Sequence, residues 1–381
     1  MRYGRRIVQI LVAERGLWAV CMASALLMAA PLLIPFPTFG EKTLRDEVRI
    51  NLDIAGQTTP SAEDLASMPE DMRELMAESR EALSDAGAAG DAGSFYDAVI
   101  RRCNAELEMI DKGYLSGDRD TDELRLRFAE LMRDLDDPDY LGTSLDASAL
   151  DAISLAPASM PALLALLPSL AIVFLVQRAV GQQRLMGQAA DPAIRIVSSS
   201  VCSMLCAAAA VLLTLVPAAA IALVRNGLGD PGYPVLYSQV GQTIVWSAAG
   251  CAAWTAALLV LASCFVAAAA SAISLIFGKA FAGPAVLAIL ALLSGMPQYY
   301  LASSPLSGVV PFLPMSYACP SKVVGYAGIF PYMDLADSVA LSPAFGCLVL
   351  AVGAAICVIC AVALDAAMRW HRAARLASRG A

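Results

Sequence analysis

Histidine and charge are what this sequence lacks most. It has one histidine, His371, in 381 residues, and charged residues make up 16% of it, against about 25% in soluble globular proteins. It contains no H-E-x-x-H motif, no pair of C-x-x-C motifs at zinc spacing and no G-x-S-x-G motif. These motifs carry zinc binding and serine hydrolysis. We therefore expect no catalytic residue, metal or cofactor in this chain.

The phosphate-binding loop of ATP-hydrolysing proteins, G-x-x-x-x-G-K-[ST], is also missing. The long apolar segments hold almost no acidic residue, and Asp365 stands only at the edge of the last one. Acidic residues within a membrane mark ion pathways, so an ion-coupled carrier or an intramembrane enzyme is disfavoured. If the chain moves a substrate, we expect a partner protein to supply the energy.

Apolar residues are abundant, at 58%, and charge is segregated along the chain. Residues 37–158 hold 28 of the 34 acidic residues and 12 of the 26 basic ones, a net charge of −16. Outside them lie segments long enough to cross a bilayer, which takes about 20 residues as a helix. Six such segments are present: residues 16–36, 159–176, 197–224, 241–278, 281–300 and 341–363. The sequence predicts an all-α polytopic membrane protein with six transmembrane helices, in preference to a soluble protein with six buried helices.

Basic residues between the spans predict the orientation. Twelve of them fall on one side: Arg2, Arg5, Arg6, Arg15, Arg178, Arg184, Arg195, Lys279, Arg369, Arg372, Arg375 and Arg379. Only Arg225 and Lys322 fall in the short loops on the other side. Since loops rich in lysine and arginine stay in the cytoplasm, both termini are predicted to be cytoplasmic in a multi-pass protein of the cell membrane. The first span is about 20 residues with no small-residue cleavage site after it, which favours an uncleaved anchor over a signal peptide.

Four parts follow from this topology. They are the cytoplasmic N-terminus with the first span (1–36), an acidic external domain (37–158), a five-helix transmembrane domain (159–368) and a basic cytoplasmic tail (369–381). The external domain is predicted to be mainly helical with one strand, hence α+β. Residues 48–54, VRINLDI, alternate apolar and polar as in a half-buried strand. Three helices are expected after it, with start signals at Ser61, Ser94 and Thr121.

Eight of the ten cysteines lie in predicted spans, where they behave as small apolar residues. Cys103 and Cys319 lie outside them. In an oxidising external space the two could form a disulfide. Cys103 also falls on the apolar face of its predicted helix, which suits a buried free thiol. The sequence leaves both alternatives open.

The polar stretch at residues 176–197, VQRAVGQQRLMGQAADPAIRIV, separates the second span from the third. Its order of residues resembles the first cytoplasmic loop of type-2 ABC exporter permeases, and the matching positions are Phe174, Arg178, Gly181, Leu185, Met186, Pro192 and Arg195. Gln177 stands where that family prefers glutamate. The segment EVRINLDIAGQTTPSAEDL is similar to the start of the external domain in sodium- and peptide-exporter-like members. The proline-rich residues 295–320 are similar to their external re-entrant segment.

The resemblance implies the membrane-spanning permease subunit of an ATP-driven ABC exporter. Residues 177–196 would then form a coupling loop seated on a separate ATP-binding ABC subunit, with contacts from Gln177, Arg178, Gly181, Arg184, Leu185, Met186, Asp191, Pro192 and Arg195. It also implies a homodimer, or a heterodimer with a second permease, in the lipid bilayer and without nucleic acid. Two alternatives stay open. The loop could serve only to fix orientation, or the chain could be a non-transporting sensor or assembly factor whose external domain binds a ligand or partner protein.

Overall fold

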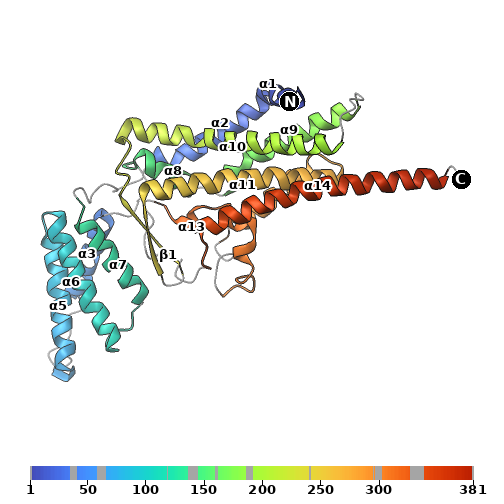
Figure 1. Cartoon of the computed structure of the whole chain (residues 1–381). Coiled ribbons are helices and arrows are strands. Elements are labelled where there is room, and N and C mark those ends of the chain that lie inside the picture. Colours follow the sequence, from blue (N-terminus) through green and yellow to red (C-terminus); the bar gives the residue numbers. More distant parts are fainter. Residues whose placement is uncertain are drawn as a thin grey trace.

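Long apolar helices lying side by side form the body of the molecule, and a smaller helical domain stands at one end of them (Figure 1). This computed structural model describes residues 2–34, 41–57, 66–117, 119–135, 145–158, 162–185, 192–239, 242–294, 296, 303–326 and 339–379.

Five helices in the described residues are long and apolar enough to cross a membrane. They are α2 (Arg15–Ala29) with its extension η1 (Ala30–Leu32), α9 (Ala162–Leu185), α10 (Pro192–Asn226), α11 (Ala248–Phe277) and α14 (Pro343–Arg379). α11 is central, since it packs against α9, α10 and α14. The hydroxyl of Ser247 caps its start by accepting from the backbone N of Gly250 (3.1 Å), and Gly278 ends it at a φ of +65°. This part of the fold confirms a helical, membrane-embedded class of protein.

The predicted fifth span is the exception. Among the described residues of this region the helix is α12 (Ala282–Ser294), whose 13 residues reach about 20 Å at 1.5 Å per residue. A bilayer core is about 30 Å thick, so six spans are not confirmed. The predicted fourth span also began too early. Residues 242–247 form β2 (Gln242–Ser247), which pairs antiparallel with β1 (Pro234–Gln239) in a hairpin before α11.

The acidic segment folds as helices without the predicted strand. α3 (Glu41–Gln57), α5 (Glu70–Ala88), α6 (Ala92–Asp111) and α7 (Arg119–Arg133) pack together at one end of the molecule (Figure 1). The prediction of a strand at residues 48–54 was wrong because these residues belong to α3. Leu44 and Val48 are buried four residues apart, with Leu52 half-buried on the same face, so the helical spacing decides which side chains are covered.

Two of the predicted helix starts are corrected. Asp91, rather than Ser94, caps α6, since its carboxylate accepts from the backbone N of Ser94 (2.8 Å). The hydrogen bonds from Ser94 lower the pKa of Asp91. α7 begins at Arg119, two residues before Thr121. The predicted start at Ser61 lies outside the described residues.

Charged side chains link the helices of the acidic segment. Arg125 of α7 reaches Glu47 of α3 at 2.6 Å and Asp122 at 3.1 Å. Cys103 lies buried on α6 close to these groups, and burial raises its pKa to about 12. The possible disulfide is absent from the structure, in which Cys103 and Cys319 are not bonded to each other. Cys319 lies far along the chain, where its Sγ contacts the backbone O of Ser294 (3.8 Å).

Shorter elements join the two parts of the molecule. α8 (Ala149–Ala158) packs on α10 and α11, and Ser148 precedes its first turn, donating from its backbone N (3.1 Å) and its hydroxyl (2.6 Å) to the carboxylate of Asp151. Before α14, the chain forms η3 (Val310–Phe312), η4 (Pro314–Tyr317) and α13 (Ser321–Val324). The side chain of Tyr317 is fully buried, and its hydroxyl donates to the backbone O of Pro311 (2.8 Å). This proline-rich segment is therefore packed on the helix bundle.

Candidate functional site

The end of the bundle away from α3, α5, α6 and α7 holds the ends of several long helices. The N-terminal helix α1 (Arg2–Ala13), the end of α9, the start of α10 and the last turns of α14 all lie toward this end (Figure 1). The two ends of the chain that Figure 1 marks thus lie on the side opposite α3, α5, α6 and α7.

The predicted coupling-loop residues lie mostly on two helices. Gln177, Arg178, Gly181, Arg184 and Leu185 belong to α9, while Pro192 and Arg195 belong to α10. Met186 and Asp191 lie outside the described residues. The predicted boundaries 177–196 were therefore too wide for a loop, because the transmembrane helices continue into them. Only residues 186–191 separate α9 from α10.

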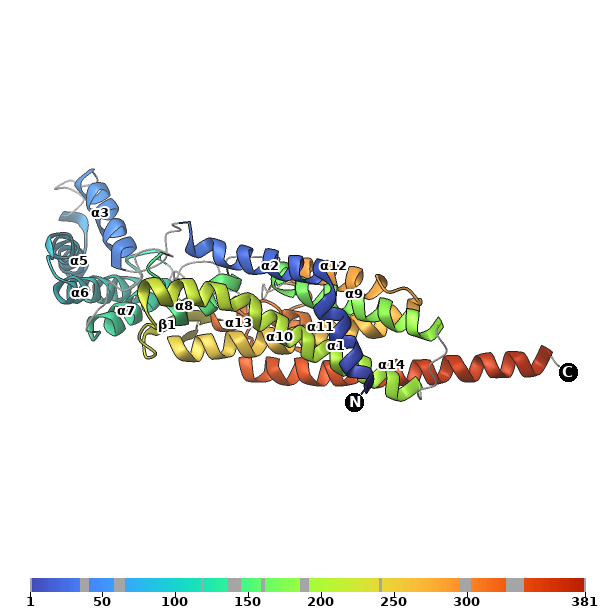
Figure 2. The ribbon, with the colours of Figure 1, turned by 90° about the horizontal axis from the view of Figure 1, so that it is seen from above.

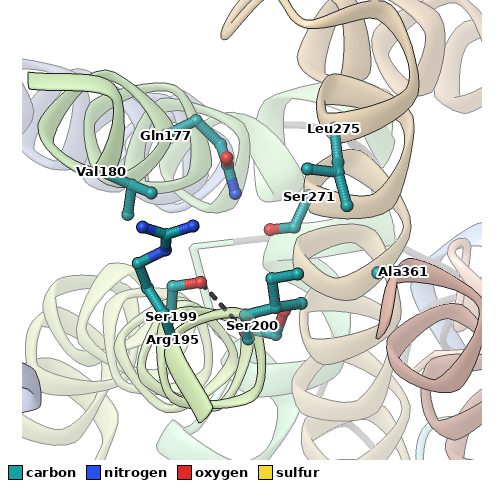
Figure 3. Close-up of a pocket in the computed structure, with 9 residues that line it drawn as sticks. Gln177, Val180, Arg195, Ser199, Ser200, Ser271, Leu275 and Ala361 are labelled. Carbon is teal, nitrogen blue, oxygen red and sulfur yellow. Dashed lines mark hydrogen bonds between the residues drawn. The ribbon is translucent and has the colours of Figure 1, made fainter. Parts of the chain in front are cut away.

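Two of these residues meet at a small polar niche between the helices. Gln177 of α9, Arg195 and Ser199 of α10 and Ser271 of α11 line it, and Figure 3 shows Gln177, Arg195 and Ser271 pointing toward one another. Leu275 and Ala361 close the apolar side. The cavity is about 10 Å³, the size of a single water molecule. The niche brings together α9, α10, α11 and α14 at the predicted coupling end.

The niche holds polar atoms that other side chains leave unmatched. Arg195 Nε and Ser271 Oγ are buried without a hydrogen-bond partner among the described residues, whereas the hydroxyl of Ser199 donates to the backbone O of Ile196 (3.0 Å). A buried donor without a partner costs about 1–3 kcal/mol. The half-buried guanidinium of Arg195 therefore presents a fixed positive charge where α9, α10 and α11 converge.

Asp365 is the one acidic residue in the described spanning helices. It lies on α14, one turn beyond Ala361, and is mostly buried. The Nε of Arg369 forms an ion pair with its Oδ2 (3.1 Å) and donates to its backbone O (3.3 Å). Asp365 is thus paired with Arg369 at the same end of the bundle as the niche.

Sequence reasoning found Gln177 and Arg195 but missed Ser271. The only available signal was a serine inside an otherwise apolar span. Its proximity to Arg195 follows from the packing of α10 on α11, which no local pattern reports. In the same way, the residues of α1 were read only for their charge, although Ile7 and Leu11 recur at helical spacing between basic residues.

Two serines one turn apart on α11 provide a test of this description. Ser274 Oγ donates to the backbone O of Ala280 (3.2 Å) and accepts from the backbone N of Gly283 (3.2 Å). We expect Ser274→Ala to lower the thermal unfolding midpoint in detergent, at a cost of about 1–3 kcal/mol for the lost bonds. Ser271→Ala removes a hydroxyl with no partner in the niche and should leave the midpoint within about 1 °C of the original. An equal loss in both variants would contradict the assignment.

The comparisons with known proteins add no identity to this geometry. The chain matches no protein-family model, no curated protein and no solved structure. The described residues also contain no group of three or more histidine, cysteine, aspartate or glutamate side chains able to hold a metal ion.

Proposed function

We propose that this chain is the membrane-spanning permease subunit of an ATP-driven exporter of the type-2 ABC class. One observation carries the proposal. The end of α9 and the start of α10, which flank the stretch whose residue order resembles a coupling loop, lie at the same end of the bundle as both termini and opposite α3, α5, α6 and α7 (Figure 1). We assign the cytoplasmic side to this end because it carries the arginines.

Energy would enter at this connection from a separate ATP-binding subunit. Leu185 and Met186 would supply apolar contacts in a groove of that subunit, as amphipathic helices do in protein grooves. Arg178 is exposed and Arg195 half-buried at the adjoining helix ends, where they would attract acidic side chains. A closing movement of the ATP-binding subunits would then tilt α9 and α10 together. The permease would act as a homodimer or beside a second permease chain.

Co-purification tests this proposal. We expect a tagged, full-length chain extracted from its native membrane to elute with an ATP-binding subunit, and we expect the double variant Leu185→Asp, Met186→Asp to lose it. Charged side chains would prevent apolar contact at the interface while leaving all spans unchanged. Leu115→Asp is the matched control, because Leu115 is exposed near the external helices. Unchanged co-elution of the double variant would reject the coupling role.

A non-transporting sensor or assembly factor is the second candidate function. It is favoured by the external domain, in which four helices share an aromatic core of Phe95, Tyr96 and Phe128 beneath an acidic surface. Elution of the wild-type chain without any ATP-binding subunit, but with a protein bound to the external domain, would support this alternative.

A further inference from the structure

The N-terminal helix α1 is amphipathic and lies across the bundle. Ile7 and Leu11 are almost fully buried against α9 and α10, whereas Arg5 and Arg6 are exposed. Figure 2 shows α1 running transverse to the long helices. A helix with one apolar and one basic face, transverse to membrane spans, has the geometry of a segment lying in the membrane interface.

An apolar groove opens where α1 meets α2. It measures about 130 Å³ and is enclosed by side chains of α1, α2, α9 and α10, among them Val8, Val12, Trp18, Ile172 and Leu213. The indole N–H of Trp18 donates to the backbone O of Val12 (2.8 Å). This bond holds the ring at the groove while 47% of the residue remains exposed. The groove therefore has an apolar wall that is open to the lipid side.

Arginines lie close in sequence to residues that line this groove, since Arg5 is three residues before Val8 and Arg15 is three residues before Trp18. Residues 1–36 carry four arginines and one acidic residue, Glu14. The side chains of Arg5, Arg6 and Arg15 are exposed. An anionic phospholipid has an apolar acyl chain and a negatively charged phosphate. The acyl chain would match the apolar groove, and the phosphate would match the exposed arginines of the interfacial helix. A neutral lipid would match the groove only.

We propose that the corner between α1 and α2 binds one anionic phospholipid, with an acyl chain in the groove and the headgroup beside Arg5, Arg6 and Arg15. The site is separate from the α9–α10 connection and does not depend on coupling to an ATPase. It would fix the level at which the N-terminal helix rests in the membrane.

Trp18 lines the groove and is a built-in probe. In a full-length variant with Trp246→Phe, Trp254→Phe and Trp370→Phe, Trp18 is the remaining tryptophan. We would reconstitute it in phosphatidylcholine containing brominated phosphatidylglycerol or, separately, brominated phosphatidylcholine. Bromine quenches tryptophan on contact. The expected result is half-maximal quenching by the anionic lipid at a mole fraction at least threefold lower than for the neutral one.

Two further variants test separately the contribution of the arginine charges and that of the apolar groove to lipid binding. Arg5→Gln with Arg6→Gln should remove the difference between the lipids. Ala209→Phe should weaken quenching by both, because Ala209 lines the groove. Ala220→Phe is the matched control, an exposed alanine three turns along α10. Should the tryptophan variant not fold, native mass spectrometry of the unaltered chain should show one retained phosphatidylglycerol per chain. Equal quenching by both lipids, or no retained lipid, would overturn the proposal.

Discussion

Replacing Gly283 by valine is expected to prevent α12 from docking on α11. A Cβ atom at this position would lie 1.9 Å from the backbone O of Ala270 and 2.7 Å from its Cα. Backbone atoms of a central helix cannot rotate away as a flexible side chain can. Ordinary overpacking costs about 1–3 kcal/mol, and separating two helices also removes the hydrogen bond between Ser274 and Gly283. We therefore expect a loss above about 3 kcal/mol, a large part of the 5–15 kcal/mol typical of folded proteins.

The measurement is the monodisperse fraction after extraction in mild detergent, together with the thermal unfolding midpoint. Gly283→Ala should be intermediate, because its single methyl group meets the same backbone. Gly16→Ala is the matched control, since no atom lies within 4 Å of a Cβ at that helical position. It should be neutral or stabilising by up to about 1 kcal/mol. Wild-type behaviour of Gly283→Val would show that α11 and α12 are not in backbone contact.

Tyr317→Ala is expected to be the most damaging substitution in the proline-rich segment before α14. The ring is fully buried and lies directly on Gly346 of α14, where a Cβ would come within 2.2 Å of the ring carbon Cδ1. Removing a buried aromatic side chain costs about 3–5 kcal/mol, because it leaves a cavity. We therefore expect the segment that contains η3 and η4 to detach from α14.

Limited proteolysis and thermal unfolding would measure this effect. Cleavage between residues 303 and 326 should become rapid in Tyr317→Ala. Tyr317→Phe keeps the ring and loses only the hydrogen bond to Pro311, so it should cost about 1 kcal/mol. If the alanine variant resisted protease as well as the phenylalanine variant, the ring would not be what holds this segment.

The length of the uncharged apolar segments, called apolar length below, predicted most of the long apolar helices. About 20 consecutive residues without charge need burial or contact with lipid. The fifth predicted span is not confirmed, because the described helix there, α12, has 13 residues. Apolar length failed at residues 242–247, where β-branched residues in an uncharged run pair with β1 as a strand. A short apolar run does not distinguish strand from helix by composition alone.

The strand predicted in the external domain shows a different weakness. Val48, Ile50, Leu52 and Ile54 alternate along the chain, yet Ile50 and Ile54 are exposed in α3. Val48 and Leu52 satisfy both the two-residue and the helical spacing. A strand needs a pairing partner, and the neighbouring described segments form helices. Tertiary packing on α5 therefore decides in favour of helix.

The niche could be predicted only in part. Arg195 was noticeable in the sequence as a charge at the start of an apolar helix. Gln177 was noticeable because it stands before Arg178, where the resembled family prefers glutamate. Ser271 comes from a distant helix and carries no charge, so only the contact of α10 with α11 reveals it. Polar residues that meet through helix packing leave no periodic pattern in the sequence.

The length of α14 has a mechanical consequence. Figure 1 shows its last turns running past the ends of α9 and α10 as one continuous helix. From Asp365 to Arg379 this overhang is about 21 Å long at 1.5 Å per residue. A tilt of about 10° where α14 leaves the bundle would swing its tip by about 4 Å. Because the displacement of the helix grows with its distance from the bundle, a spectroscopic label near Arg379 would report small rotations of α14 that are hard to detect within the spans.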